Sequence, residues 1–476
     1  MNTVQNHPYS FKPGEISSLV RKALSTASSS GGALIPQSLE KLITTAVIEL
    51  VPEMAVIDPV RVYSNYHEFD RLTALPGGHG VIGELGVTPT SNSQYERVGR
   101  YLKNFRRKGA VTGFLMDTSE QFIDAKAVEM ENHVQVHGYN IATQLVWGHD
   151  MADPYAPPGL DSFIQTNRDV GTRGGTVPTD LSMLDDMIDN NDRLQGSNHR
   201  RVFLMSPEML SKVSRLLTNV RKNQDEGGGL TRVSIPGGWR LSAYRDVPIV
   251  TTTRTRNDVQ MGTVTPSKAD TGGTIAADEW FFEVSFIDIN GESVASAEVS
   301  VTTVAATSLV KLEWADVPSA VYYKVYCGTA SGGAKLVAIL PATTYDSVGT
   351  PTGRVTEVTF STTPTTRNPT VSAPAELVLT LPAVATPVTA KMANDIPIVQ
   401  TGGVTPERII FWDLDKVQGL GKFAYGNSSG SRFGGLITME PKASTDDNWP
   451  FLLKTYGTLI DAFEKSSYIA MNVRRK

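Results

Sequence analysis

The chain has 476 residues, of which 40% are hydrophobic and 20% charged, and its formal net charge is −5. This length predicts two or more domains, and the composition is typical of a globular protein. The single cysteine, Cys327, excludes an internal disulfide and favours a reducing compartment, with the thiol buried as a small hydrophobe. No stretch reaches the roughly 18 apolar residues of a membrane span, and Met1 to Gly14 lacks the pattern of a signal peptide. The negative charge argues against a protein whose main task is tight binding of nucleic acid.

The first 60 residues predict an arm and then a helix. Apolar residues from Ile16 to Leu24 share one face of a short amphipathic helix, and a Ser/Gly-rich linker follows at 25–32. A helix on such a tether has little to pack on, so it either docks on a neighbouring subunit or forms a disordered tail. A second helix is expected from Leu39 to Ile48.

Residues 61–113 predict a long β-hairpin. Two strand-like arms, the second from about Tyr95 to Phe114, flank a Gly-rich middle that begins near Gly77. An isolated hairpin is marginal in water, so we expect this one to lie across something else.

The second arm of the hairpin is strongly basic. Three roles fit its cations: contact with nucleic-acid phosphates, pairing with acidic patches on a neighbouring subunit, or an exposed edge that discourages aggregation. We treat them as candidate inter-subunit contacts. They are Arg97, Arg100, Lys103, Arg106, Arg107 and Lys108.

A single long helix is predicted from Phe122 to Gly148. Its apolar residues recur at steps of three, four and seven and form one stripe, and Gly148 with later prolines marks its end. At 1.5 Å per residue the helix would be about 40 Å long. The stripe consists of Ile123, Ala127, Met130, Val134, Ile141 and Leu145.

The region after this helix predicts an αβ layer. Asp180 can cap a helix, Val202–Met205 is typical of a buried strand, and Ser206 followed by proline marks another helix start. Paired strands are expected from Trp239 to Thr253, with Val247–Val250 at a sheet edge because it contains a proline.

From about Thr255 to Lys391 short strand patterns recur between turns and helical periodicity is absent, which predicts an inserted β-sandwich. This insert has 8 basic and 13 acidic residues, so the remainder of the chain is about neutral. After it the αβ character returns, with strands at Ile409–Trp412 and Gly435–Met439 and a tail from Trp449 to Val473 that predicts a strand and a short helix.

No motif predicts a catalytic, cofactor or metal site. Ser428 lies in a G-x-S-x-G match, but no buried strand, helix or downstream histidine surrounds it, so a loop is favoured. His133 and His137 are spaced for a metal but lack the H-E-x-x-H glutamate, which favours packing or solvent-facing histidines. Asp185, Asp186 and Asp189 are most simply a solvated helix face.

Four short motifs occur in order along the chain: Gly31–Pro36; Leu145–Gly148 followed by Pro158–Leu160; Val202–Pro207; and Tyr244–Val250. Their order, with that of arm, hairpin, long helix and αβ units, resembles the major capsid proteins of tailed bacteriophages with the HK97-type fold. The fourth motif departs from the family pattern at Asp246, where glycine is common. The insert resembles fibronectin type III or immunoglobulin-like modules, although its late-type strands precede its early-type strands.

The resemblance implies an α+β, HK97-like capsid fold with an inserted all-β sandwich. Its expected parts are an N-terminal arm (1–33), the start of a peripheral domain (34–60), an extended hairpin loop (61–113), the spine helix and peripheral domain (114–226), the first part of an axial domain (227–254), the insert (255–391), the second axial part (392–440) and the peripheral return (441–476).

The resemblance further implies a structural protein of the virion, not an enzyme, without cofactor or metal. Assembled in the host cytoplasm, hexamers and pentamers would form an icosahedral shell around double-stranded DNA, with the insert on the outer surface. A near-neutral body suits a container, and many weak contacts between copies can close a shell. Separate scaffolding and portal proteins are expected partners, and a membrane is not.

Three alternatives stay open. An encapsulin-like shell of the same fold would hold protein cargo. An enzyme would depend on Ser428. A surface-binding protein would use its insert to grip a carbohydrate or a host surface, and deleting residues 255–391 would then leave particles intact.

Overall fold

The computed structural model describes residues 51–57, 60–62, 65–77, 86–87, 90–119, 125–195, 200–221, 231–234, 240–304, 307–346, 350–361, 371–372, 378–379, 392–414, 420–426, 438–441, 448–461 and 464–476. The predicted arm, the helix expected at 39–48 and Ser428 lie outside these residues. Within them, no helix is both long and apolar enough to cross a membrane.

The predicted long helix is α5, described from Ala125 to Trp147. It ends at Gly148 as predicted, and a Cβ added there would lie 2.2 Å from the carbonyl oxygen of Pro157, so glycine lets the next loop cross closely. The stripe forms the buried face, which confirms the face assignment. Its buried members are Met130, Val134, Ile141 and Leu145.

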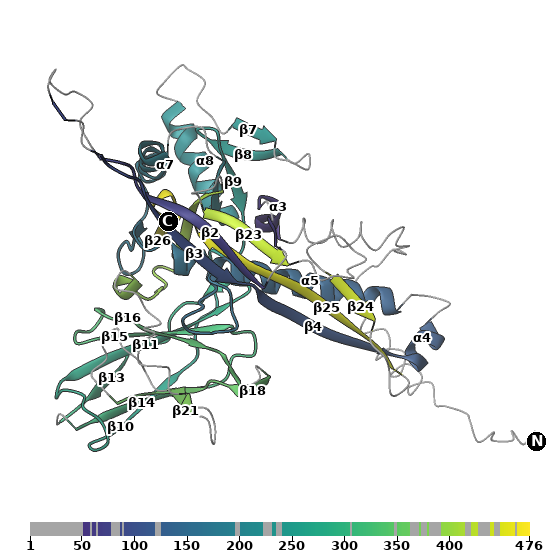
Figure 1. The fold of residues 1–476 in the computed structure, drawn as a ribbon. Coiled ribbons are helices and arrows are strands. Elements are labelled where there is room, and N and C mark those ends of the chain that lie inside the picture. Colours follow the sequence, from purple (N-terminus) through teal and green to yellow (C-terminus); the bar gives the residue numbers. More distant parts are fainter. Residues whose placement is uncertain are drawn as a thin grey trace, which may run out of the picture.

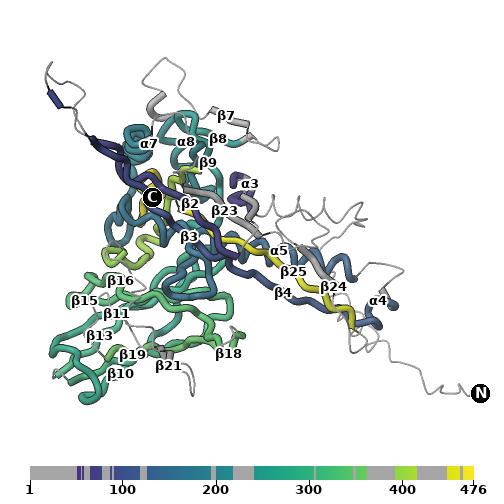
Figure 2. Tube along the Cα trace, in the orientation of Figure 1, coloured from purple at the N-terminus to yellow at the C-terminus, as the bar shows by residue number. Residues whose placement is uncertain are grey.

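A five-stranded sheet lies along α5 (Figure 1). Its longest strand, β25 (Asn448–Asp461), pairs antiparallel with β4 (Lys103–Thr112), β23 (Leu420–Gly426) and β24 (Thr438–Pro441). The short β1 (Val60–Val62) pairs with β23 in parallel. Figure 2 shows the late, yellow β25 beside the early, blue β4, so segments far apart in the sequence build this sheet together.

The predicted hairpin consists of β2 (Tyr66–Ala74) and β3 (Gln94–Tyr101), which pair antiparallel. The expected return arm, Tyr95 to Phe114, is divided between two sheets, because its second half is β4 and pairs with β25. Leu102 lies between β3 and β4 in the sequence and packs with Ile460. Within the described chain, β2 and β3 pair with no further strand, and Figure 1 shows them extending to the upper left.

The αβ layer contains a seven-stranded sheet in the order β5-β26-β22-β6-β9-β8-β7. The predicted tail helix is instead one 3₁₀ turn, η2 (Glu464–Ser466), between β25 and β26. The strands are β5 (Arg168–Asp169), β6 (Arg201–Met205), β7 (Thr231–Ser234), β8 (Arg240–Tyr244), β9 (Val247–Thr251), β22 (Glu407–Asp413) and β26 (Tyr468–Val473).

Alternate residues of these strands face two different cores. Phe203 and Phe411 pack with helices α7 (Ser182–Gln195) and α8 (Pro207–Arg221), whereas Leu204 and Trp412 join the cluster that contains the end of α5. The predicted helix caps are confirmed. The Asp180 carboxylate accepts a hydrogen bond from the Ser182 amide at 3.1 Å, and the Ser206 hydroxyl accepts one from the Met209 amide at 3.1 Å.

The prediction that Val247–Val250 lies at a sheet edge is wrong. β9 lies between β6 and β8. Pro248 pairs with Ala243, next to the Tyr244–Val247 pair that closes the hairpin turn. Parallel pairing of β9 with β6 begins only at Ile249. The missing N–H of Pro248 therefore removes no backbone hydrogen bond between β9 and its neighbouring strands. Asp246 has φ +64°, a left-handed backbone conformation that glycine adopts at the lowest cost.

Two sheets built from residues 264–360 face each other across one hydrophobic cluster. Phe282 stacks on Phe360 with ring centroids 5.7 Å apart, and Trp314 lies 5.2 Å from Tyr323, each pair joining the two sheets. One sheet has the order β10-β14-β19, from β10 (Val264–Ala269), β14 (Leu309–Trp314) and β19 (Glu357–Phe360). The other has the order β12-β11-β15-β16, with β13 beside β11, from β11 (Glu279–Asp288), β12 (Gly291–Glu292), β13 (Val299–Thr302), β15 (Tyr322–Gly328) and β16 (Lys335–Pro341).

The second of these sheets is buried on both faces. Tyr323 and Val325 point into the cluster between the two sheets, whereas Tyr322 and Tyr326 join the cluster that contains Trp147 of α5. The remaining short elements are α3 (Pro52–Ala55), α4 (Gly113–Ser119), α6 (Leu160–Phe163), β17 (Thr343–Tyr345), β18 (Pro351–Arg354), β20 (Val371–Ser372), β21 (Val378–Leu379) and η1 (Met392–Asn394).

Candidate functional site

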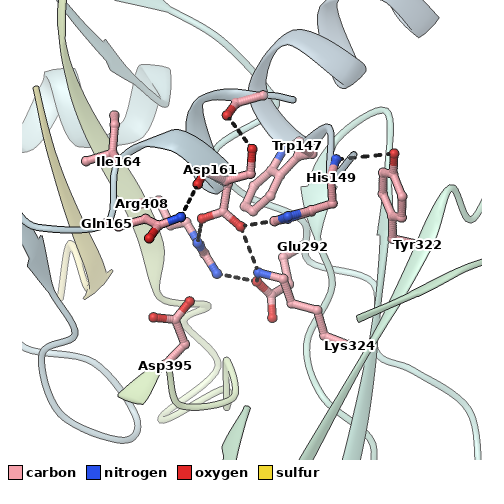
Figure 3. A network of polar contacts seen from close by, with 12 residues as sticks. Trp147, His149, Asp161, Ile164, Gln165, Glu292, Tyr322, Lys324, Asp395 and Arg408 are labelled. Carbon is pink, nitrogen blue, oxygen red and sulfur yellow. Dashed lines mark hydrogen bonds and ion pairs between the residues drawn. The ribbon is translucent and has the colours of Figure 1, made fainter. Parts of the chain in front are cut away.

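A network of buried charges lies where the end of α5, the β15 sheet and β22 meet (Figure 3). The Asp161 carboxylate on α6 accepts from Arg408 Nη1 at 2.8 Å and from Lys324 Nζ at 3.2 Å. Lys324 Nζ also lies 3.0 Å from Glu292 Oε2, and the Arg408 guanidinium donates to the same carboxylate. Four charged side chains from four distant parts of the chain therefore share one site.

A third cation and a third carboxylate extend the network. Arg168 Nη2 lies 2.9 Å from Asp161 and 2.5 Å from Asp395. His149 Nε2 lies 3.3 Å from Asp161, and burial lowers the pKa of this imidazole. We call the six charged side chains the buried ion network, and its three carboxylates balance its three cations. They are Asp161, Arg168, Glu292, Lys324, Asp395 and Arg408.

The network holds the carboxylates of Asp161 and Glu292 in the ionised form. Burial alone would raise the pKa of Asp161, but Lys324, Arg168 and Arg408 together hold it well below its usual range. Burial would also raise the pKa of Glu292, and Lys324 and Arg408 lower it. Side-chain exposure is 3% or less throughout the network, so water contributes little to this balance.

Aromatic side chains enclose the charges. Lys324 Nζ and the Arg408 guanidinium lie 5.2 Å and 4.7 Å from the ring centroid of Trp147, whose Nε1 donates to the Arg254 carbonyl at 3.0 Å. The Tyr326 hydroxyl donates to Glu292. With every charge paired and enclosed, the site is suited to joining elements and not to receiving a ligand.

The six basic residues predicted as inter-subunit contacts divide into two groups. Most of them contact their own chain. Arg97 Nε lies 2.9 Å from Asp70 across the hairpin, and Arg100 lies 3.6 Å from Asp150. Burial lowers the pKa of Lys103, whose Nζ donates to the Pro154 carbonyl at 2.6 Å.

Arg107 also contacts its own chain, because its Nε donates to His133 Nδ1 at 3.2 Å. Arg106 and Lys108 lie on the opposite, exposed face of β4, and within the described residues neither side chain forms an ion pair or a hydrogen bond. Lys454 of β25 stands opposite Arg106. This exposed face therefore concentrates positive charge, and these two residues remain candidate contacts with another molecule.

The other candidate residues have structural roles. His133 also bonds Glu129 at 3.0 Å, and His137 bonds the Thr455 hydroxyl at 2.9 Å, which confirms packing histidines. Cys327 is buried as predicted, which raises its pKa to about 12. The described residues hold no cluster of three or more metal-binding side chains.

The predicted acidic face of α7 is exposed, but Asp185, whose side chain is 37% exposed, also pairs within the chain. Its carboxylate accepts from the Tyr244 hydroxyl at 2.9 Å and from Arg245 Nη1 at 3.0 Å. Arg245 also lies 2.8 Å from Asp189, so the acidic residues hold the β8–β9 turn against α7.

Sequence reasoning missed the buried ion network. One signal was present in β15, where Tyr322–Gly328 has large side chains on both faces and Lys324 as its sole charge. A strand without a polar face is buried on both sides. A lysine in such a strand requires a buried carboxylate partner, and that requirement could have located the site.

The sequence matches no protein-family model and no curated protein. Solved structures similar to this chain include the holo-SrpI encapsulin complex from Synechococcus elongatus PCC 7942, with 8% identity, a TM-score of 0.43 and coverage of 98% of this chain and 97% of that chain. The capsid of the native GTA particle has 11% identity, a TM-score of 0.39 and coverage of 94% and 98%. The capsid of Myoviridae phage XM1 has 7% identity, a TM-score of 0.41 and coverage of 89% and 92%.

Proposed function

We propose that this chain is the major capsid protein of a tailed bacteriophage and that its copies assemble into an icosahedral shell around double-stranded DNA. The observation that carries the proposal is the β2–β3 hairpin, which pairs with no further strand among the described residues. Leu75, Tyr95 and Tyr101 on it are 75%, 71% and 63% exposed. A two-stranded ribbon with such side chains in water is marginal, so it gains stability from a surface of another copy.

Exposed apolar side chains at the other end of the spine support the same proposal. Phe114 of α4 and Trp449 of β25 are 73% and 54% exposed. Each subunit thus has exposed apolar side chains at two different places among its described residues. Contacts between unlike surfaces of identical subunits are heterologous, and such contacts close into rings when the rotation allows. Hexamers and pentamers of a shell are rings of this kind.

The order of elements also supports a capsid subunit. A hairpin, a long helix with a sheet along it and an αβ layer follow in the order that the resemblance of the four sequence motifs implies. In this proposal the domain division follows the expected boundaries, residues 255–391 form an immunoglobulin-like sandwich on the outer surface, and separate scaffolding and portal proteins take part in assembly. A near-neutral body outside that insert would let the DNA enter and leave.

The test is to express the chain together with the other proteins of its phage, to purify the particles that form and to image them by electron microscopy. We expect closed shells whose DNA survives nuclease treatment. Mass spectrometry of their contents distinguishes a DNA container from a shell filled with protein cargo. A monodisperse monomer that forms no particles would refute the proposal.

A further inference from the structure

We propose that the two-sheet unit of residues 264–360 is a clamp that fixes the base of the β2–β3 hairpin relative to α5, acting through the loop Gly148–Ile164. The proposal concerns the single subunit and does not depend on shell assembly. It rests on where this loop is held and by which groups.

The two-sheet unit makes the first set of contacts with the loop. The Tyr322 hydroxyl donates to Gln144 Oε1 at 2.8 Å, next to the loop, and accepts from the His149 amide at 3.4 Å. Further along the loop, Lys324 lies 3.2 Å from Asp161. Two neighbouring side chains of one strand, β15, therefore hold both ends of the loop.

The hairpin base and the strand after it make the second set of contacts with the loop. Arg100, the next-to-last residue of β3, lies 3.6 Å from Asp150, and its guanidinium lies 5.2 Å from the ring centroid of Phe163. Lys103 at the start of β4 donates to the Pro154 carbonyl at 2.6 Å. The hairpin base thus contacts the start, middle and end of the same loop.

The two sets of contacts make the loop a rigid connection. Leu160 and Ile164 are fully buried, and Asp161 is paired on all sides, so the loop has no room to shift without separating buried charges. Separating such charges is strongly unfavourable. A displacement of β15 must therefore move the loop, and the loop must carry Arg100 and Lys103 with it.

Hydrogen–deuterium exchange of the full-length protein tests this coupling. In Lys324→Met we expect the backbone amides of 98–102 to exchange about tenfold faster, measured relative to amides of α8, which packs on the far face of the seven-stranded sheet. The matched control is Lys311→Met on β14, whose ion pairs with Glu313 and Glu357 lie on the other sheet of the same unit. The control should leave 98–102 unchanged.

The outcomes separate a clamp from a local contact. Faster exchange in 149–163 with an unchanged hairpin base would overturn the proposal, as would equal acceleration in α8. If Lys324→Met does not yield soluble protein, Tyr322→Phe removes one hydroxyl without disturbing charge, and we then expect about threefold faster exchange at 98–102. No change at 98–102 in that variant would overturn the proposal equally.

Discussion

Neutralising Asp161 is the sharpest test of the buried ion network. Its two oxygens face Arg168, Lys324 and Arg408 within 3.2 Å, and its exposure is 1%. The substitution Asp161→Asn keeps the shape of the side chain but leaves three cations against two carboxylates. Because the site is enclosed, no solvent can compensate the excess charge.

The expected magnitude follows from the burial. Removing one partner of a buried ion pair costs about 3–5 kcal/mol. At about 2.1 cal/mol/K per residue, a chain of 476 residues unfolds with an entropy of about 1 kcal/mol/K, so Tm should fall by about 3–5 °C. The doubly changed chain Asp161→Asn, Lys324→Met restores equal numbers of buried cations and carboxylates. Its loss should be smaller than the sum of the two single losses by about 0.5–3 kcal/mol.

Differential scanning fluorimetry of all variants in one assembly state measures these shifts, since oligomerisation itself moves Tm. The control is Asp150→Asn, which breaks the partly exposed pair with Arg100 and should cost less than about 1 kcal/mol. A Tm for Asp161→Asn within 1 °C of wild type (about 1 kcal/mol on this scale) would refute the reasoning, as would additive losses in the double variant.

Four further predictions follow from other parts of the chain. Burial lowers the pKa of His137 to about 4, so the contribution of this group to stability is complete above about pH 6.5 and up to about 3 kcal/mol of it is lost as pH falls to 4; in urea titrations the stability of wild type relative to His137→Gln should decline by this amount. Burial raises the pKa of Glu407 to about 7, so the folded chain keeps a proton that the unfolded chain releases near pH 4.5, and up to about 3 kcal/mol of this group's contribution to stability is lost as pH rises from about 4.5 to 7; in the same titrations the stability of wild type relative to Glu407→Gln should decline by this amount. Charge reversal of Arg106 and Lys108 to glutamate should reduce particle yield in electron micrographs while Tm shifts by less than the equivalent of about 1 kcal/mol. Replacing residues 255–391 by a short linker should reduce the soluble, folded yield, seen by circular dichroism, because it removes two charges of the buried ion network; intact particles from that variant would contradict the structure.

Local patterns predicted most of the elements correctly. The stripe along α5, the caps at Asp180 and Ser206 and the strand at Ile409–Trp412 depend on neighbours in sequence, and the structure confirms each. Pro248 misled the prediction because its effect depends on which side of the strand its nitrogen faces. That side is set by the turn before it and by β6, which lies far away in sequence.

The buried ion network could not be predicted in the same way. Asp161, Glu292 and Arg408 each stand in segments where a surface charge would look identical, and they meet only after several elements have packed. The pairing of β4 with β25 is equally non-local. The sequence pattern predicted β3 and β4 as one arm of a hairpin, because an alternating basic strand can pair with either β2 or β25. Only the apolar residues of β4 that face α5 select β25 as its partner.

That pairing has a consequence for the order in which the protein can be made. The ribosome releases β4 early and β25 only near the end, and the central sheet needs both. At about 5–20 residues per second, roughly 20–70 s separate the two strands during translation. Throughout that interval β4 has an open edge and α5 lacks part of its cover, so the nascent chain stays exposed to wrong partners until its last segment emerges.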